Sequence, residues 1–430
     1  MEMSLITAAT EHLTALSPVT NILNSKYFEA LEAKTQLEEA ERSMIKRNKI
    51  IFDRLKEQAS ANGYSKFHDA ICISTHNEET KNWLKTISSS QTELSTQFEE
   101  NTFKLKDAFS ITTFFYNNDK YIFISGVESL TLSSNWFELI ENNAGILTLF
   151  LSLNLIPFIN KSSDVGKIYD TILFRDDELN GPRYIEKEDI ESFFSNYCVF
   201  KIINESNFIN FDLYRIASYI SLCLRRDFYV NVDLELTNSL EYLINEGDRN
   251  INFINFAKSV YIIDEPYILF MELYRMLERL YAIPTLRILQ GKLSLRGQCL
   301  WNISKELEQT TGWRKNEKEG LISLLDSLNV SQLFDMCTTI KTGSLKDFSI
   351  ENVEYKKTIF ETTTSDDNRK TVESEYKRAM ISVLSNYIYQ VRNSHVHYRE
   401  TLNTYLSDDE LRILCKAMLI AINPIYINTL

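Results

Sequence analysis

The spacing of hydrophobic positions changes along the chain and predicts regions of different secondary structure. Between residues 21 and 60 no glycine or proline interrupts the sequence, and apolar residues recur every seven positions, which indicates a long helix. Near residue 108 the period shortens. Residues 109–116 and 120–124 are rich in β-branched and aromatic residues and flank a short polar segment, which predicts a hairpin. Further β-rich segments are predicted at residues 168–175, 198–203 and 228–236.

Helical spacing returns after residue 264. The segment 264–266 (Asp-Glu-Pro) combines an acidic cap with a proline in the first turn, so we expect a helix that runs to Leu280. Shorter helices are predicted at residues 298–310 and 317–328.

The longest helix of this region is expected to begin near Glu373, after a polar connector at residues 361–368. Ser407 and Glu410 have the spacing of a capping box and open a last helix, which Asn423-Pro424 is expected to end. Apolar residues three, four or seven positions apart predict the buried stripe of the long helix: Tyr376, Met380, Val383, Leu384, Tyr387 and Val391.

These patterns predict a predominantly α protein with a mixed α+β N-terminal and middle region. We expect an N-terminal helical region (1–107), a β-rich α+β domain (108–264) and an all-α helical domain (265–430). Charge supports the second boundary. Residues 265–430 hold 21 Lys and Arg and 21 Asp and Glu, so the net charge of −13 lies entirely in the first 264 residues. Any RNA bound by this acidic chain has to meet a local basic surface in the C-terminal part.

Composition indicates a soluble, cytoplasmic protein. Glycine (11) and proline (6) are scarce, and the six cysteines are scattered without a CxxC pair, as expected of reduced thiols. The N-terminus lacks a basic segment before an apolar one, and the apolar window at residues 144–159 is too short to span a membrane, so we expect buried core there. Gly291-Lys292 lacks the Walker pattern around it, and we expect no cofactor.

The segment 387–398, at the end of the long helix, carries two of the five histidines of the chain. Helical phase places His395 with the buried stripe and puts Asn393 and His397 on another face. Arg392 and His397 are about 140° apart on an ideal helix, so both reach one substrate only if the helix ends or bends there.

Two interpretations of this segment assign it no catalytic role, and a separate group of histidines is a further metal candidate. Arg392 could pair with an acid such as Glu278 while the histidines pack. His395 and His397 could bind a metal, but they point to nearly opposite faces, and no cysteine or carboxylate cluster nearby completes a ligand set. A further zinc candidate is formed by three residues spaced by four: His68, Cys72 and His76. A partly buried helix face is the stronger interpretation of this spacing.

The order Arg392, Asn393, then His397 resembles the motif of the HEPN superfamily, whose nucleases carry an arginine, four to six residues and a histidine. The segment 272–279 also looks like the first helix of that family, with its internal acidic position. The resemblance covers residues 265–430. It implies an all-α HEPN-like bundle that acts as a metal-independent endoribonuclease, at a composite site formed by two motifs across a homodimer.

In that chemistry the ribose 2′-OH attacks the neighbouring phosphate and the leaving 5′-oxygen is protonated. His397 suits a general acid or base near neutral pH, Arg392 can bind the phosphorane oxygens, and Asn393 would orient the phosphate or the histidine. Lys377, Arg378 and Arg399 are candidates for phosphate contacts, although solvated helix-face charge also explains each.

The resemblance further implies a toxin-like or antiviral-defence effector. We then expect the N-terminal region to bind a regulatory protein or a phage trigger. The alternative is a non-catalytic HEPN-like module for binding or assembly, in which Arg392 is a structural residue.

Overall fold

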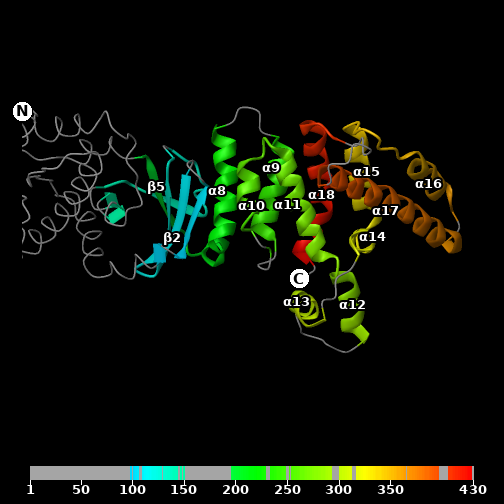
Figure 1. Ribbon diagram of the computed structural model, residues 1–430, viewed down its shortest axis with the longest axis horizontal. Helices are drawn as coiled ribbons and strands as arrows, with labels where there is room; N and C mark the ends of the chain where they lie inside the picture. Colours follow the sequence, from blue (N-terminus) through cyan, green and yellow to red (C-terminus); the bar gives the residue numbers. More distant parts are fainter. Residues whose placement is uncertain are drawn as a thin grey trace, which may run out of the picture. The chain divides into compact units, whose positions relative to one another are not determined.

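A computed structural model of the chain shows a mostly helical protein with a five-stranded antiparallel sheet in its middle region (Figure 1). It forms two compact units, Met1–Ile209 and Asn210–Leu430. The structure describes residues 97–98, 100–105, 109–127, 129–143, 146–147, 149–150, 195–228, 233–247, 251, 253–292, 300–311, 316–364, 366–396 and 405–428.

The first unit contains the sheet, whose strand order is β1-β2-β3-β5-β4 with every neighbouring pair antiparallel. The central strand, β3, is buried along almost its whole length, because it pairs on both sides and both of its faces are covered. The strands are β1 (Thr102–Leu105), β2 (Phe109–Tyr116), β3 (Asp119–Ser125), β4 (Phe137–Ile140) and β5 (Tyr197–Ile202).

The predicted hairpin is confirmed as β2 and β3. Tyr116 pairs with Asp119, so only Asn117 and Asn118 form the turn. Both asparagines have positive φ, 51° and 67°, as a two-residue type I′ turn requires, and asparagine tolerates this conformation better than most residues. The predicted β-rich segment at residues 198–203 is confirmed as β5.

Aromatic rings fill one side of this sheet. Phe114 and Phe123 lie on the same face of their strands, and the Phe150 ring stacks on Phe123 with ring centroids 3.9 Å apart. Phe150 belongs to the apolar window at residues 144–159, and the described members of that window, which also include Ile146, are buried as predicted.

The described residues of the second unit form helices and no strand. α18 lies at its centre and packs against α9, α11 and α15, while α17 packs against α14, α15 and α16 (Figure 1). Its helices are α8 (Leu213–Phe228), α9 (Leu234–Glu246), α10 (Phe256–Tyr261), α11 (Pro266–Leu280), α12 (Ile283–Lys292), α13 (Leu300–Thr311), α14 (Glu317–Asp326), α15 (Val330–Thr342), α16 (Glu351–Thr362), α17 (Asp366–Val396) and α18 (Asp408–Asn428).

The long helix α17 buries the predicted stripe. Five of its six members are buried, and only Val383 is half-exposed. Ile388, which completes the same face between Leu384 and Val391, is fully buried. The stripe packs α17 onto its neighbours and fixes which residues at the far end of the helix face inward.

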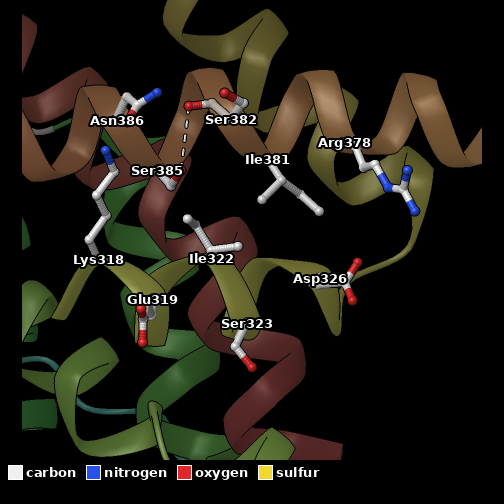
Figure 2. A pocket seen from close by; sticks show the side chains of 10 residues that line it. All are labelled: Lys318, Glu319, Ile322, Ser323, Asp326, Arg378, Ile381, Ser382, Ser385 and Asn386. Carbon is white, nitrogen blue, oxygen red and sulfur yellow. Dashed lines mark hydrogen bonds between the residues drawn. The ribbon is translucent and has the colours of Figure 1, made fainter. Parts of the chain in front are cut away.

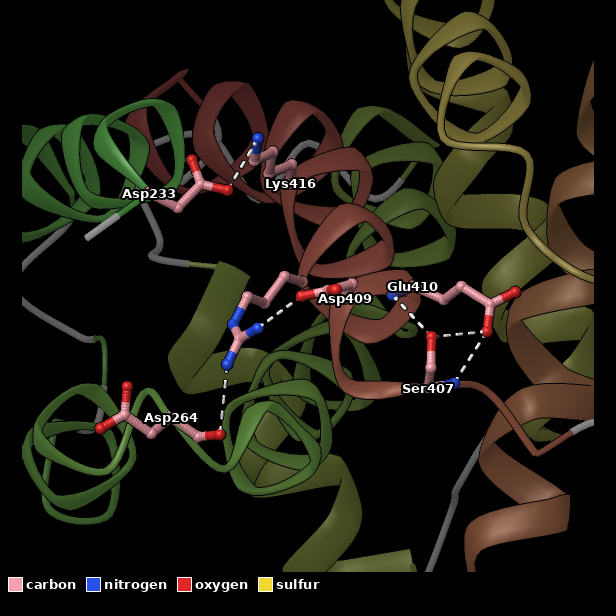
Figure 3. Close-up of polar contacts among 7 residues, drawn as sticks. Asp233, Asp264, Ser407, Asp409, Glu410 and Lys416 are labelled. Atoms are coloured by element: carbon pink, nitrogen blue, oxygen red, sulfur yellow. Dashed lines mark hydrogen bonds and ion pairs between the residues drawn. The ribbon is translucent and has the colours of Figure 1, made fainter. Parts of the chain in front are cut away.

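The capping box that opens α18 is confirmed (Figure 3). The Glu410 carboxylate accepts the backbone N–H of Ser407 at 2.8 Å, and the Ser407 hydroxyl accepts the backbone N–H of Glu410. Burial opposes ionisation of Glu410, but hydrogen bonds from the backbone of Ser407 and Lys346 lower the pKa of this carboxyl overall. One turn further on, Lys416 pairs with Asp233 at 2.8 Å and so joins α18 to the start of α9.

The predicted β-rich segment at residues 228–236 is wrong where the structure describes it. Phe228 ends α8, and Leu234 to Leu236 form the first turn of α9, capped by the Asp233 side chain. Helices α8 to α10 belong to the second unit, where α10 packs on α8 and α11. The compact units therefore divide at residue 209, whereas charge and pattern placed the boundary at 264. The sheet also begins before residue 108, with β1.

Two details at helix ends also differ from the expectations. Pro424 does not end α18, which continues to Asn428 because Tyr426 is buried and donates a hydrogen bond to the Met276 carbonyl at 3.0 Å. Pro266 occupies the first turn of α11 as predicted, but the Glu265 side chain makes no capping hydrogen bond.

Other expectations lie outside the described residues. They concern the helix at 21–60, the β-rich segment at 168–175 and the cluster of His68, Cys72 and His76. Among the described helices, none is long and apolar enough to cross a membrane. The four described cysteines are buried free thiols: Cys198, Cys223, Cys337 and Cys415.

Candidate functional site

One face of α11 supplies the base of the candidate site. Tyr274, Glu278 and Tyr281 follow one another at spacings of four and three residues, so they lie on the same side of the helix and just beyond its end. The opposite face of α11 is apolar and packs on α18. The polar face is therefore held in a fixed orientation by the core behind it.

α14 brings a second carboxylate to this face. Glu317 is its first residue, and the Asn316 side chain caps the helix by accepting the backbone N–H of Lys318 at 3.1 Å. One turn later Gly320 lies directly against the Tyr281 ring, where a side chain would overlap it. This close approach of α14 to Tyr281 places Glu317 beside the end of α17.

Arg392, near the end of α17, lies between the two carboxylates. Its Nη2 is 3.3 Å from Glu317 Oε1 and 3.8 Å from Glu278 Oε1, and its Nη1 donates to Asn393 Oδ1 at 3.0 Å. The guanidinium carbon lies 5.5 Å from the centre of the Tyr274 ring. The Arg392 side chain is 16% exposed. The cluster of Tyr274, Glu278, Glu317, Arg392 and Asn393 is called the Arg392 cluster below.

The guanidinium is held loosely for an arginine this deeply placed. Several ion pairs in the described parts of the chain are shorter, such as Arg226–Glu241 at 2.6 Å, whereas Arg275–Glu272 has the same length as Arg392–Glu317, 3.3 Å. Arg392 Nε has no hydrogen-bond partner among the described residues. This Nε is buried, so a further oxygen can reach the guanidinium only through the four N–H groups at Nη1 and Nη2.

Burial sets the electrostatics of the cluster. It raises the pKa of the Glu278 carboxyl, with the neighbouring Glu317 adding to the rise and Arg392 opposing it. It also raises the pKa of Tyr274 to about 12. Two carboxylates thus share one guanidinium, and Glu278 is the one whose charge is disfavoured.

His395 lies on a different face and packs among aromatic rings. Its ring stacks on Tyr267 with centroids 5.4 Å apart, and the rings of Phe270 and Tyr405 lie at 6.1 and 5.4 Å. His395 Nδ1 is 2.9 Å from the Val391 carbonyl oxygen, which can only accept, so Nδ1 carries the proton in this contact. The prediction that His395 joins the buried side of the helix is confirmed.

The remaining candidates fall into two groups. Lys377 is engaged by Asp326, with its Nζ 2.5 Å from the Asp326 carbonyl and 3.5 Å from the carboxylate. Arg378 is exposed and lines an open groove between α14 and α17. His397 and Arg399 lie outside the described residues.

The geometry bears on the sequence interpretation in two ways. The contact between Arg392 and Glu278, which belonged to the alternative interpretation of Arg392 as a structural residue, is present at 3.8 Å. Glu317, which lies closer to Arg392, was not predicted as a site residue, because a helix N-terminus 75 positions away gives no local signal that links it to Arg392.

Among the described residues, no group of three or more His, Cys, Asp or Glu side chains could hold a metal ion. Comparison of this chain with protein-family models, curated proteins and solved structures finds no match. Function is therefore inferred from the Arg392 cluster, in which a guanidinium contacts an adjacent amide, and from His397, which follows Arg392 by five residues in the sequence.

Proposed function

We propose that this protein is a metal-independent endoribonuclease of the HEPN type, whose reaction is carried by Arg392 and His397. The observation that supports the proposal is the Arg392 guanidinium, whose Nη2 is 3.3 Å from Glu317 and 3.8 Å from Glu278 and whose Nη1 donates to the neighbouring Asn393. An arginine can donate two parallel hydrogen bonds to a phosphate, whereas only Nη2 of Arg392 contacts the two carboxylates.

Each residue has one role in the proposed reaction. His397 accepts the proton of the ribose 2′-OH or protonates the leaving 5′-oxygen, and its second copy in the dimer performs the other step. Arg392 stabilises the charge that develops on the phosphorane. Asn393, which accepts from Arg392 Nη1 at 3.0 Å, orients that guanidinium.

The biological setting follows from the resemblance to HEPN proteins. The second unit would form a homodimer in which two motifs face each other. The first unit would bind the regulatory protein or phage trigger that controls the nuclease, as in a toxin or an antiviral-defence effector.

One observation favours a second candidate, a non-catalytic HEPN-like module for binding or assembly. Arg392 is mostly buried and pairs with carboxylates from two other helices, so it ties α17 to α11 and α14. In that case its role is to hold the three helices together, and His397 has no chemical part.

The two candidates are separated by assaying cleavage of a fluorescent RNA by the full-length protein and its variants. We expect cleavage without added metal and in EDTA. His397→Ala and Arg392→Ala should each lower kcat by ~10²–10⁴-fold, and Asn393→Ala should lower it less. Lys370→Ala, which removes an exposed cation from the same helix, is the matched control and should cleave as the parent does.

Thermal unfolding of each variant completes the experiment. Loss of cleavage by His397→Ala with an unchanged melting temperature supports catalysis. Parent-level cleavage by His397→Ala contradicts the mechanism. Absence of cleavage in the parent, together with strong destabilisation by Arg392→Ala, favours the non-catalytic module.

A further inference from the structure

An open groove of about 700 Å³ lies between α14 and α17. Figure 2 shows its two walls, with the Ile322 and Ile381 side chains pointing into the space between the helices. Its lining residues are Lys318, Glu319, Ile322, Ser323, Asp326, Arg378, Ile381, Ser382, Ser385 and Asn386. The volume falls in the range of sites that bind small ligands or short polymer segments.

Two cations and two carboxylates line this groove. Lys318 and Arg378 stand at opposite ends, and neither forms an ion pair with any part of the chain that the structure describes. Of the two lining carboxylates, Asp326 is engaged by Lys377, and the Glu319 side chain points away from α17. An anionic ligand therefore meets a cation at each end.

Between the cations the groove offers apolar and polar contacts together. Ile322 is 39% exposed and gives a flat group an apolar surface to pack on. Ser382 and the half-buried Asn386 lie alongside and supply hydrogen-bonding groups. Bases and riboses of a single strand use this combination, whereas a duplex hides its base faces.

The two helices that wall the groove, α14 and α17, also supply residues of the Arg392 cluster. On α14, Lys318 directly follows Glu317, which contacts Arg392. On α17, Arg378, Ser382 and Asn386 are four residues apart, and Asn393 follows seven residues later on the same face. At 1.5 Å per residue, Asn386 and Asn393 are about 10 Å apart along the helix axis.

We infer that this groove binds a single-stranded RNA segment next to the scissile phosphate, with Lys318 and Arg378 contacting phosphates and Ile322 packing on a base or ribose. This inference rests on the proposed ribonuclease function and specifies its substrate as unpaired RNA. The two cations alone would also attract an acidic peptide. RNA is favoured because the helices that wall the groove also carry residues of the Arg392 cluster, where the scissile phosphate would bind.

The test measures binding of a labelled 2′-O-methyl RNA oligonucleotide to the full-length protein, by fluorescence anisotropy at several salt concentrations. The methyl group blocks the proposed nucleophile, so binding is observed without cleavage. Lys318→Ala and Arg378→Ala should each weaken binding by about 10-fold and reduce the salt slope by about 1. Ile322→Asp should also weaken it, and Lys370→Ala should leave the Kd unchanged.

Kinetics on a cleavable RNA add a second readout. Arg378→Ala should raise KM with little change in kcat, because the groove contacts substrate and transition state equally. These side chains are exposed or half-exposed on helix surfaces, so the variants should keep the parent's melting temperature.

The outcomes separate the inference from the proposed function. If cleavage depends on His397 but the double variant Lys318→Ala/Arg378→Ala leaves Kd and KM unchanged, the groove is not the RNA-binding site and the ribonuclease proposal still stands. Binding through the groove without cleavage overturns only the ribonuclease. Absence of RNA binding overturns the groove, as does equal affinity for duplex RNA or displacement of the oligonucleotide by a poly-glutamate peptide at equal charge.

Discussion

Replacing Glu278 with glutamine is expected to stabilise the protein slightly at neutral pH. Glu278 and Glu317 share one guanidinium, and burial together with Glu317 raises the pKa of Glu278 in spite of the attraction from Arg392. A raised pKa means that the folded protein disfavours the charged form. Glutamine keeps the shape of the side chain and its acceptor oxygen but removes that charge.

The magnitude follows from the geometry of the cluster. At an effective dielectric constant of about 20, each pair of unit charges at these distances interacts by about 4–5 kcal/mol before desolvation. The attraction that Glu278 loses is offset by the repulsion and desolvation that it also loses, and its side chain is 31% exposed, so solvent screens both. We expect a net gain of about 0.5 kcal/mol. Arg392→Gln, which leaves two carboxylates without their cation, should cost about 2 kcal/mol.

The pH dependence gives the prediction a sign that can be checked. In the parent, the contribution of Glu278 to stability falls as pH rises above the ordinary carboxyl value of 4.5 and levels off above the raised folded pKa of Glu278. In Glu278→Gln this fall is absent, so the two curves should meet below about pH 4.5 and separate toward neutral pH.

The assay is urea unfolding of the helical signal by circular dichroism at a series of pH values. Glu373→Gln changes an exposed carboxylate on α17 in the same way and should match the parent at every pH. A loss of 1 kcal/mol or more in Glu278→Gln at neutral pH, on the order of a lost buried hydrogen bond, would refute the reasoning. It would mean that the Glu278 charge is needed to hold Arg392.

Three further predictions concern other parts of the described structure. Gly320→Ala should destabilise the protein by about 1–3 kcal/mol, because the added Cβ would overlap the Tyr281 ring. Gly291→Ala, which has open space around it, should stabilise the protein by about 0.5 kcal/mol. Urea unfolding compares the two variants, and equal effects would contradict the packing of Gly320 on Tyr281. Glu410→Gln should lower the free energy of unfolding by about 0.5 kcal/mol at neutral pH, because the pKa of Glu410 is lowered in the folded protein and the ionised carboxylate contributes stability above the ordinary value of 4.5. This contribution is lost as pH falls through the folded pKa, so the difference in unfolding free energy between variant and parent should shrink in acid. A difference that does not depend on pH would argue against the cap. The four described thiols should resist iodoacetamide in the native protein and react after unfolding, because they are buried and burial raises their pKa. Mass spectrometry of tryptic peptides measures this reaction. Rapid alkylation of the native protein would place one of these thiols at the surface.

Local signals predicted those elements whose ends are marked in the sequence. The hairpin at Asn117-Asn118, the proline that opens α11 and the Ser407–Glu410 capping box each act within a few residues, so the sequence shows them directly. α15 has a comparable signal, since Asn329 and Gln332 form a capping box before an apolar stripe at helical spacing, and it was overlooked in the sequence.

Tertiary packing decided the elements that sequence reasoning missed or misplaced. The β-branched and aromatic residues after Phe228 suggested a strand, but Asp233 caps a helix whose apolar side packs on α18. Pro424 should break a helix by its local chemistry, and burial of Tyr426 overrides it. The division at residue 209 follows from the packing of α8 to α10 with the later helices, which no composition change marks.

In the candidate site, the sequence likewise predicted only relations between residues of the same helix. Helical phase separated His395 from Arg392 correctly, because both lie on one regular helix. It did not reveal Glu317 or Lys318, which reach the site from another helix through the contact of Gly320 with Tyr281. Residues brought together by packing carry no common pattern in the sequence.

The central claim is that Arg392 and His397 cleave RNA by attack of the neighbouring 2′-OH, and the chemical ends of the products test it most directly. Mass spectrometry of fragments produced by the full-length protein in EDTA should find a 2′,3′-cyclic phosphate on the upstream fragment and a 5′-hydroxyl on the downstream one. Fragments with a 3′-hydroxyl and a 5′-phosphate would contradict the account, because they require attack by water in place of the ribose. RNA that stays intact would contradict it as well.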